Sequence, residues 1–287
     1  MRRLLIRSLA AAHREAEEDW KVPPPAARAW FVAPILLVPA VALLWWIDRP
    51  LLHSLAEEDG LFEWAQVVLF GLGMATAVSV ARRLGETGRR AAASLYLGAA
   101  AGLFFVAGEE LAWGQRFLHF GTPDALAAVN EKAEVSIHNI RSIEAWFTFA
   151  KLVAGAYGAF GAWVLMRWGV RHDPSPWRLF VVPAYLSSPF LVVLAMRALR
   201  LTAIREALPA GYSELEELFL AWGSATFLRH ARRILPRPGG EGPGAIGARG
   251  GGREPGLARR APETADRRFD GGPPFLPGDL PGRPTGL

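Results

Sequence analysis

The apolar residues of this chain are gathered into long blocks, and short polar segments separate them. Such blocks are typical of polytopic membrane proteins, whereas a globular domain spreads its apolar residues at the period of each element. A helix of about 20 residues crosses the hydrocarbon core of a bilayer, so each block predicts one span. The pattern therefore predicts an all-α fold, a polytopic membrane helix bundle with about six transmembrane helices: Trp30 to Ile47, Leu61 to Ala81, Ala91 to Leu111, Glu144 to Met166, Trp177 to Met196 and Tyr212 to Leu228.

Two segments outside these blocks differ in composition. Residues 1–29 mix basic and apolar side chains, which predicts an amphipathic segment on the cytoplasmic surface and no cleaved signal peptide. Residues 236–287 are rich in Gly, Pro and Arg and poor in large apolar residues, which predicts a disordered tail. The six-span domain would occupy residues 30–235, with a re-entrant or interfacial loop at 109–143.

Positive charge alternates between the ends of the predicted spans. Arginine is frequent before the first span, in the second loop and after the last span, while the first loop is acidic. The positive-inside rule then places both termini in the cytoplasm. The fifth loop breaks this pattern, because Arg197 and Arg200 would lie outside. We expect them to be partners of buried carboxylates, ligands of an anionic substrate group, or contacts to lipid headgroups.

The composition excludes some classes of site. The chain has no cysteine, so it has neither disulfides nor thiolate metal ligands. Its isoelectric point is about 10.0, yet Lys occurs only at positions 21, 132 and 151. A preference for Arg over Lys is explained by a GC-rich genome, so the high isoelectric point says little about nucleic acid. We therefore expect membrane lipids as partners, and no nucleic acid.

Glu217 is the most unusual residue of the pattern. Counted back from the basic segment that starts at Arg229, it lies about 18 Å inside a hydrocarbon core about 30 Å thick. A carboxylate at this depth needs a partner, a proton or a water-filled cavity. Glu217 is thus expected to face the bundle interior and to be catalytic or ion-binding. Its predicted companions are Arg116, Arg197, Glu109, Glu110 and Gln66.

The end of the third predicted span supplies further candidates on the same external side. Glu109, Trp113 and Arg116 have a spacing that shares one helical face, which predicts that the helix continues beyond the hydrocarbon. Glu109 and Arg116 could form a simple salt bridge. Alternatively Arg116, together with Gln115, holds an anionic substrate group, while Glu109 or Glu110 holds a metal or a proton.

The third predicted loop adds two carboxylates and an imidazole. Glu131, Glu134 and His138 are spaced i, i+3, i+7, which would align them on a helix. They could bind a divalent metal ion together with Glu110, or Glu134 could orient His138 as an acid/base pair. A helix with solvated charges would show the same spacing. If the loop folds back onto the helix ends, His138 should lie within about 8 Å of Glu109 or Glu110.

Two stretches of this region resemble a family of uncharacterised bacterial multi-span membrane proteins. The first is Glu109-Glu110-Leu111-Ala112-Trp113-Gly114-Gln115-Arg116, similar to the pattern E-E-x-S-W-G-Q-R. The second contains Asn130, Glu134, His138 and Asn139, similar to N-x-Q-x-E-x-N-L-H-N. Ala112, Lys132, Ser136 and Ile137 depart from these patterns, so a nucleophilic serine at 112 is not available. The resemblance implies a bacterial inner-membrane protein and a site here, without an activity.

Three classes of function fit these features. The first is a membrane-embedded enzyme that acts at the outer leaflet on a lipid or lipid-linked substrate, by metal-assisted hydrolysis or group transfer. Its catalytic residues would be Glu109, Glu110, Glu134, His138 and Glu217, and its substrate-binding residues Gln115, Arg116, Asn139, Arg197 and Arg200. The second is a small proton- or cation-coupled carrier that uses Glu217. The third is a non-catalytic membrane assembly factor.

Overall fold

The computed structural model describes residues 10–57, 59–130, 132–167, 179–202 and 211–235, except the side chains of Arg116 and Arg141. These residues all belong to the first of two compact units, Met1–Gly240, and the predicted tail lies outside them. Every regular element in the described part is a helix, which confirms the all-α prediction.

The helices follow the predicted blocks closely at most positions. The long ones are α2 (Pro24–Ile47), α4 (Leu61–Glu86), α5 (Arg90–Glu110), α8 (Arg141–Arg167) and α10 (Tyr212–Ile234). The short ones are η1 (Glu15–Asp19), α3 (Arg49–Ala56), η2 (Ala112–Gly114), α6 (Gln115–Leu118), α7 (Asp124–Ala127), η5 (Ala184–Leu186) and α9 (Ser187–Arg200).

Four stretches of the described part are long and apolar enough to cross a membrane: Pro24–Ile47, Arg90–Glu110, Ser142–Leu165, and a stretch from Arg49 to Glu86 that contains the long helix α4. The other two predicted spans do not meet these requirements of length and apolar composition. The helix expected from Trp177 begins only at Ser187, so α9 has 14 residues. Pro183 precedes it and disfavours helical geometry at Val182, while Pro189 fits in the first turn. α10 is long enough but carries many charged residues.

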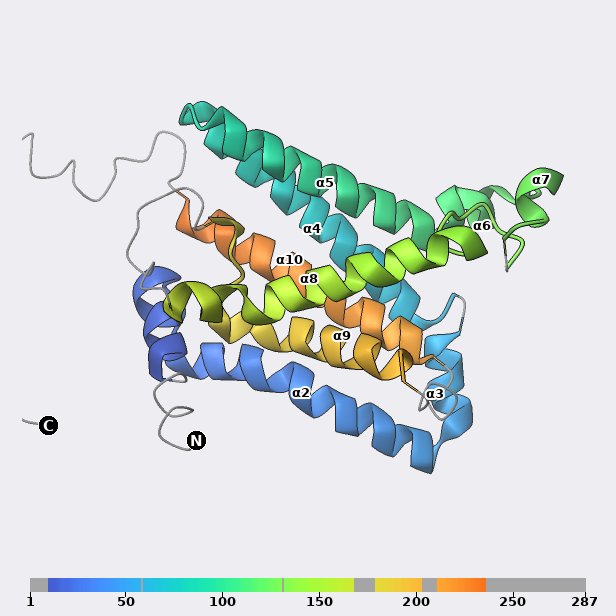
Figure 1. Ribbon diagram of the computed structural model, residues 1–287, viewed down its shortest axis with the longest axis horizontal. Helices are drawn as coiled ribbons and strands as arrows, with labels where there is room; N and C mark the ends of the chain where they lie inside the picture. The colour runs from blue at the N-terminus through green and yellow to red at the C-terminus, as the bar shows by residue number, and fades with distance from the viewer. Residues whose placement is uncertain (1–9, 58, 131, 168–178, 203–210, 236–287) are drawn as a thin grey trace, which may run out of the picture. The chain divides into compact units, whose positions relative to one another are not determined.

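α10 lies in the middle of the bundle. It packs against α4 on one side and α9 on the other, α5 covers α4, and both α8 and α2 pack against α9 (Figure 1). The helices alternate in direction, so α3, α6, α7 and the start of α10 lie at one end of the bundle. The turn between α4 and α5, at residues 87–89, lies at the other end.

Large apolar side chains are exposed along the outer faces of several helices. They include Leu36, Trp46, Leu72, Phe104, Trp146 and Phe149, on α2, α4, α5 and α8. Only Ala27 and Pro34 are buried in α2. An apolar surface of this extent is unfavourable in water and favourable against lipid chains. The surface therefore supports the assignment of a helical membrane protein.

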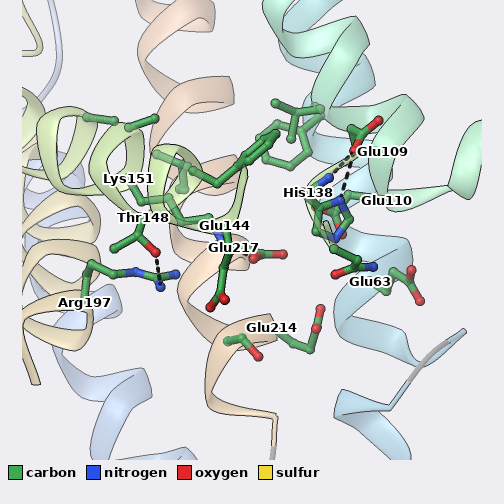
Figure 2. A pocket seen from close by; sticks show the side chains of 18 of the residues that line it. Glu63, Glu109, Glu110, His138, Glu144, Thr148, Lys151, Arg197, Glu214 and Glu217 are labelled. Atoms are coloured by element: carbon green, nitrogen blue, oxygen red, sulfur yellow. Dashed lines mark hydrogen bonds and ion pairs between the residues drawn. The ribbon is translucent and has the colours of Figure 1, made fainter. Parts of the chain in front are cut away.

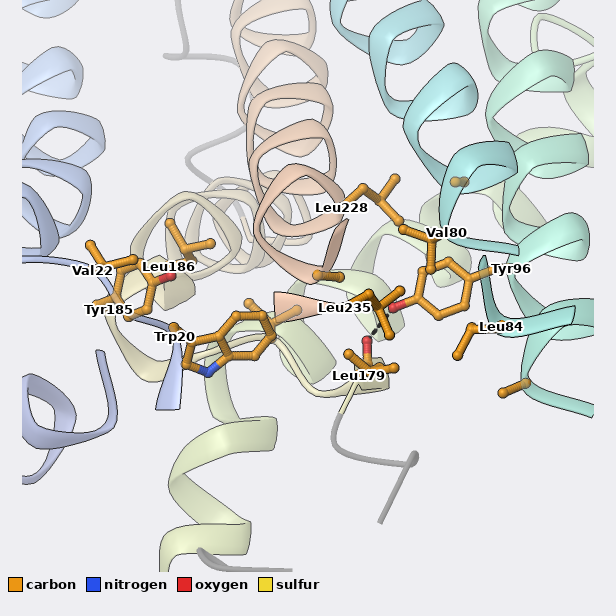
Figure 3. Packing of buried hydrophobic residues seen from close by; sticks show 14 of the residues in the cluster. Trp20, Val22, Val80, Leu84, Tyr96, Leu179, Tyr185, Leu186, Leu228 and Leu235 are labelled. Carbon is orange, nitrogen blue, oxygen red and sulfur yellow. Dashed lines mark hydrogen bonds between the residues drawn. The ribbon is translucent and has the colours of Figure 1, made fainter. Parts of the chain in front are cut away.

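The end of the bundle opposite α3 contains the larger apolar core. Trp20, Tyr96, Leu186 and Leu228 belong to one buried cluster there (Figure 3). The Tyr96 hydroxyl donates a hydrogen bond to the Leu179 carbonyl in the same cluster. Residues 11–22 contribute several buried side chains to this end. These side chains therefore pack into the bundle, while residues 1–9 of the predicted amphipathic segment lie outside the described part.

Candidate functional site

A cavity of about 380 Å³ opens within the bundle, near the end that holds α3 and α6. α8 packs closely on α9, where the missing side chain of Gly155 leaves room for the Leu194 backbone. The cavity lies between α8 and the helices α4, α5 and α10. One part of its lining is apolar, with Phe70, Val106, Phe147 and Leu220. The polar lining includes Glu63, Glu109, Glu110, Lys132, Glu134, His138, Asn139, Glu144, Lys151, Arg197, Arg200, Glu214 and Glu217.

The chain turns sharply after α5 and does not continue as a helix. Ala112, Trp113 and Gly114 all have positive φ, at 44°, 54° and 84°. The predicted continuous helical face through Arg116 is therefore wrong, and the side chain of Arg116 lies outside the described part. The turn folds the Trp113 ring back over Gly108, where a Cβ atom would lie 2.9 Å from the ring. Two non-glycine residues in this conformation store strain, which is common at functional sites.

Glu109 connects this turn to the third loop. One carboxylate oxygen, Oε1, accepts a hydrogen bond of 2.5 Å from Trp113 Nε1. The other, Oε2, accepts hydrogen bonds from the backbone N–H groups of Ile137 at 2.5 Å and His138 at 2.8 Å. It also lies 3.2 Å from His138 Nδ1. The expected proximity of His138 to Glu109 is confirmed, and the loop does fold back onto the helix end (Figure 2).

The loop that carries His138 is held together by amide side chains. Gln115 donates to the Phe120 carbonyl and Thr122 Oγ1, and its Oε1 accepts from Val135 N. Asn130 donates to the Ser136 carbonyl at 2.6 Å. Gln115, predicted to bind substrate, thus connects both ends of this loop through its side chain.

The expected helical alignment of Glu134 with His138 is not found, because residues 132–140 form turns and bends. Glu131, the other member of that spacing, lies outside the described part. Glu134 and Asn139 nevertheless both line the cavity, as predicted site residues should. Asn139 Nδ2 lies 3.4 Å from Glu134 Oε2 and donates to Ser136 Oγ at 3.0 Å. The loop thus delivers one imidazole, one carboxylate and one amide to the same wall.

Glu217 forms a salt bridge with Lys151 of α8, and both side chains are largely buried. This agrees with the expectation that Glu217 faces the interior and has a charged partner. The partner was not foreseen. Lys151 is a lysine inside an otherwise apolar block, and that pattern was the available indication of a buried functional charge.

Arg197 pairs with Glu216 and not with Glu217. Its Nε donates to Glu216 Oε1 at 2.9 Å, its Nη2 lies 2.8 Å from Oε2, and its Nη1 donates to Thr148. Figure 2 shows Arg197 and Thr148 on the side of the cavity away from His138. The predicted anion ligand is thus held by a carboxylate, as in the alternative expectation of a charge partner. Arg200 lines the cavity as well.

Three carboxylates from two helices form a compact group. Glu110, Glu214 and Glu217 each offer an oxygen, and these oxygens lie within 4.8 Å of one another. Gln66 of α4 donates to the backbone carbonyl of Glu214 at 2.8 Å and reaches its Oε2 at 3.3 Å. Of the predicted metal ligands Glu110, Glu134 and His138, only Glu110 belongs to this group. Like charges at such distances require a cation or a shared proton.

What the site can do chemically follows from the His138–Glu109 pair and from the group of three carboxylates. A histidine whose Nδ1 faces a buried carboxylate is a suitable general base, because the other ring nitrogen can take a proton. The cluster of Glu110, Glu214 and Glu217, which lines the same cavity, can hold a proton or a hard cation. Both line one cavity with an apolar wall. No protein-family model, curated protein or solved structure matches the chain.

Proposed function

We propose that this protein is a membrane-embedded enzyme in which His138, oriented by Glu109, acts as a general base on a lipid or lipid-linked substrate. The reaction is hydrolysis or group transfer at the outer leaflet of a bacterial inner membrane, with both termini in the cytoplasm. The observation that carries the proposal is the contact of His138 Nδ1 with Glu109 Oε2 at the wall of a cavity.

Glu109 is well placed to orient the imidazole. It is 2 % exposed and accepts hydrogen bonds from two backbone N–H groups and one indole in addition to His138. These donors favour its charged form, and a charged Glu109 favours a proton on His138 Nδ1. Nε2 is then the basic nitrogen. A water molecule or substrate hydroxyl that loses its proton to Nε2 can attack an acyl or phosphoryl centre, and His138 returns the proton to the leaving group.

The cavity suits an amphiphilic substrate. Its volume of about 380 Å³ falls within the range of small-molecule sites, so it would take the reacting end of a lipid and not the whole molecule. Phe70, Val106 and Phe147 would contact hydrocarbon, while Asn139 and Arg200 would contact polar groups of the headgroup. The exposed apolar faces of the surrounding helices would let the remaining chains stay in the bilayer.

The proposal is tested with the purified full-length protein and an extract of bacterial membrane lipids, with products followed by mass spectrometry. His138→Gln should lower turnover by about a hundredfold or more, the usual contribution of a general base. The matched control is His53→Gln, since His53 is an exposed histidine that pairs with Glu57 and does not line the cavity. Equal turnover in wild type and His138→Gln would refute the role of His138. Absence of any product would refute the enzyme.

A second function, a proton- or cation-coupled carrier, is favoured by one observation. The Lys151–Glu217 pair joins α8 to α10 across the cavity, and such a buried pair can exchange a proton or cation as helices move. Proton flux into liposomes that contain the protein, abolished by Glu217→Gln, would select the carrier. Turnover of lipid without such flux would select the enzyme.

A further inference from the structure

We infer that Glu110, Glu214 and Glu217 bind one hard divalent cation, with Gln66 as a further oxygen ligand. The three carboxylates come from the last turn of α5 and the first two turns of α10. One oxygen of each lies within 4.8 Å of the others. Ligands on opposite sides of a Ca²⁺ ion are about 4.6 to 5.2 Å apart, so the three oxygens can surround such an ion with little movement.

Gln66 provides the second, independent indication of a ligand. Its side chain is completely buried, and its Oε1 has no hydrogen-bond partner within the described part of the chain. Its Nε2 contacts the carbonyl and the carboxylate of Glu214. The orphaned oxygen belongs to the same amide as this Nε2 and therefore lies close to Glu214, a member of the three-carboxylate cluster. A buried amide oxygen without a partner is costly, and a cation is a partner that such an oxygen readily accepts.

The charges around the three carboxylates leave a net negative charge that a divalent cation can neutralise. Lys151 pairs with Glu217, so three carboxylates and one ammonium group leave two negative charges. The nearby basic groups Arg197 and His138 are engaged by Glu216 and Glu109. Glu63, Glu134 and Glu144 also line the cavity, together with Lys132 and Arg200, so the rest of the lining adds no excess of positive charge. One divalent cation would neutralise the two charges left by the three carboxylates and Lys151.

The type of donor atom limits which metal ions the site would bind. All four donors are oxygens, and the chain has no cysteine. Carboxylate and amide oxygens select Mg²⁺, Mn²⁺ or Ca²⁺ over softer ions. This site lies in the cavity of the proposed enzyme and would add a Lewis acid to it, but cation binding does not depend on the proposed reaction.

Binding is tested by titrating Mn²⁺ into the chelator-treated, full-length protein in detergent and following free Mn²⁺ by electron paramagnetic resonance. We expect one saturable Mn²⁺ per chain, displaced by Ca²⁺ or Mg²⁺. Glu110→Gln and Glu214→Gln should each weaken Mn²⁺ binding at least about tenfold, because loss of even an outer-shell partner has effects of this size. Gln66→Leu should also weaken it, since it removes the amide oxygen.

Two control variants separate this site from other effects. Glu144→Gln removes a carboxylate that lines the same cavity but lies outside the group, so it should bind Mn²⁺ like wild type. His138→Gln should keep Mn²⁺ binding while losing turnover, which distinguishes the cation site from the proposed general base. Absence of saturable Mn²⁺ binding in wild type would overturn the inference, whatever the variants do. Unchanged affinity in both Glu110→Gln and Glu214→Gln would overturn it as well.

Discussion

Three basic side chains at the cavity each meet a carboxylate from another element. His138 of the loop meets Glu109 of α5, Lys151 of α8 meets Glu217 of α10, and Arg197 of α9 meets Glu216 of α10. A buried charge pair is weak evidence of stabilisation, because desolvation offsets the attraction between the charges. Removal of one partner is different, since it leaves an uncompensated charge. The pairs therefore fix which helix faces meet more than they add to stability.

The Arg197–Glu216 pair allows this argument to be measured. Both side chains are almost fully buried, with 6 % and 0 % exposed. Glu216→Leu alone should lower the free energy of unfolding by about 3 kcal/mol or more, because Arg197 loses its carboxylate. The double variant Arg197→Met, Glu216→Leu should recover most of that loss. Thermal unfolding in detergent compares the variants. A double variant that is less stable than both single variants would contradict this account.

At the scale of elements, the turn after α5 determines where the loop can lie. Gly108 lets the Trp113 ring pack against the helix, and Trp113 in turn donates to Glu109. Glu109 then holds the backbone of residues 137 and 138. The position of His138 thus depends on a glycine about thirty residues earlier in the chain.

Gly108→Ala tests this dependence. The added Cβ would lie 2.9 Å from the Trp113 ring, so the ring must move and the loop should loosen, at a cost of about 1 to 3 kcal/mol. Amide hydrogen exchange at residues 133–140 should become faster. Gly102→Ala is the matched control on the same helix, because its added Cβ meets no atom within 4 Å. Equal protection of the loop in the two variants would contradict the proposed role of the turn.

The sequence was sufficient to predict the helices and insufficient to predict the pairing between them. Apolar blocks report the length of a helix directly, so α2, α4, α5 and α8 lie where they were expected. The fifth span was misplaced because Pro183, which disfavours helical geometry at Val182, was included in one block. The partners of Glu217 and Arg197 depend on which face each helix turns toward its neighbours. A hydropathy pattern does not specify that orientation. The helical spacing of Glu134 and His138 was misleading, because long-range hydrogen bonds to Glu109 shape that loop.

At the scale of the whole described unit, the carboxylate-lined cavity lies at one end of an apolar bundle. The cavity lies near α3 and α6, and the larger apolar core lies at the opposite end. Several arginines lie at the end opposite the cavity. Arg82, Arg83, Arg89 and Arg90 border the turn at residues 87–89, and Arg229, Arg232 and Arg233 end α10. In a bilayer this arrangement would keep the basic end in the cytoplasm and open the cavity to the outside.

Reporter fusions test this orientation directly. The structure places residues 87–89 and the loop before α8 at opposite ends of the bundle. A reporter inserted after Arg89 should therefore be active in the cytoplasm, and one inserted after Asn130 should be active outside. The expectation follows from the arginines around the first position, which resist transfer across a membrane with a negative interior. The same location for both reporters would contradict the orientation. Exchanged locations would place the cavity in the cytoplasm and remove the outer leaflet as the source of its substrate.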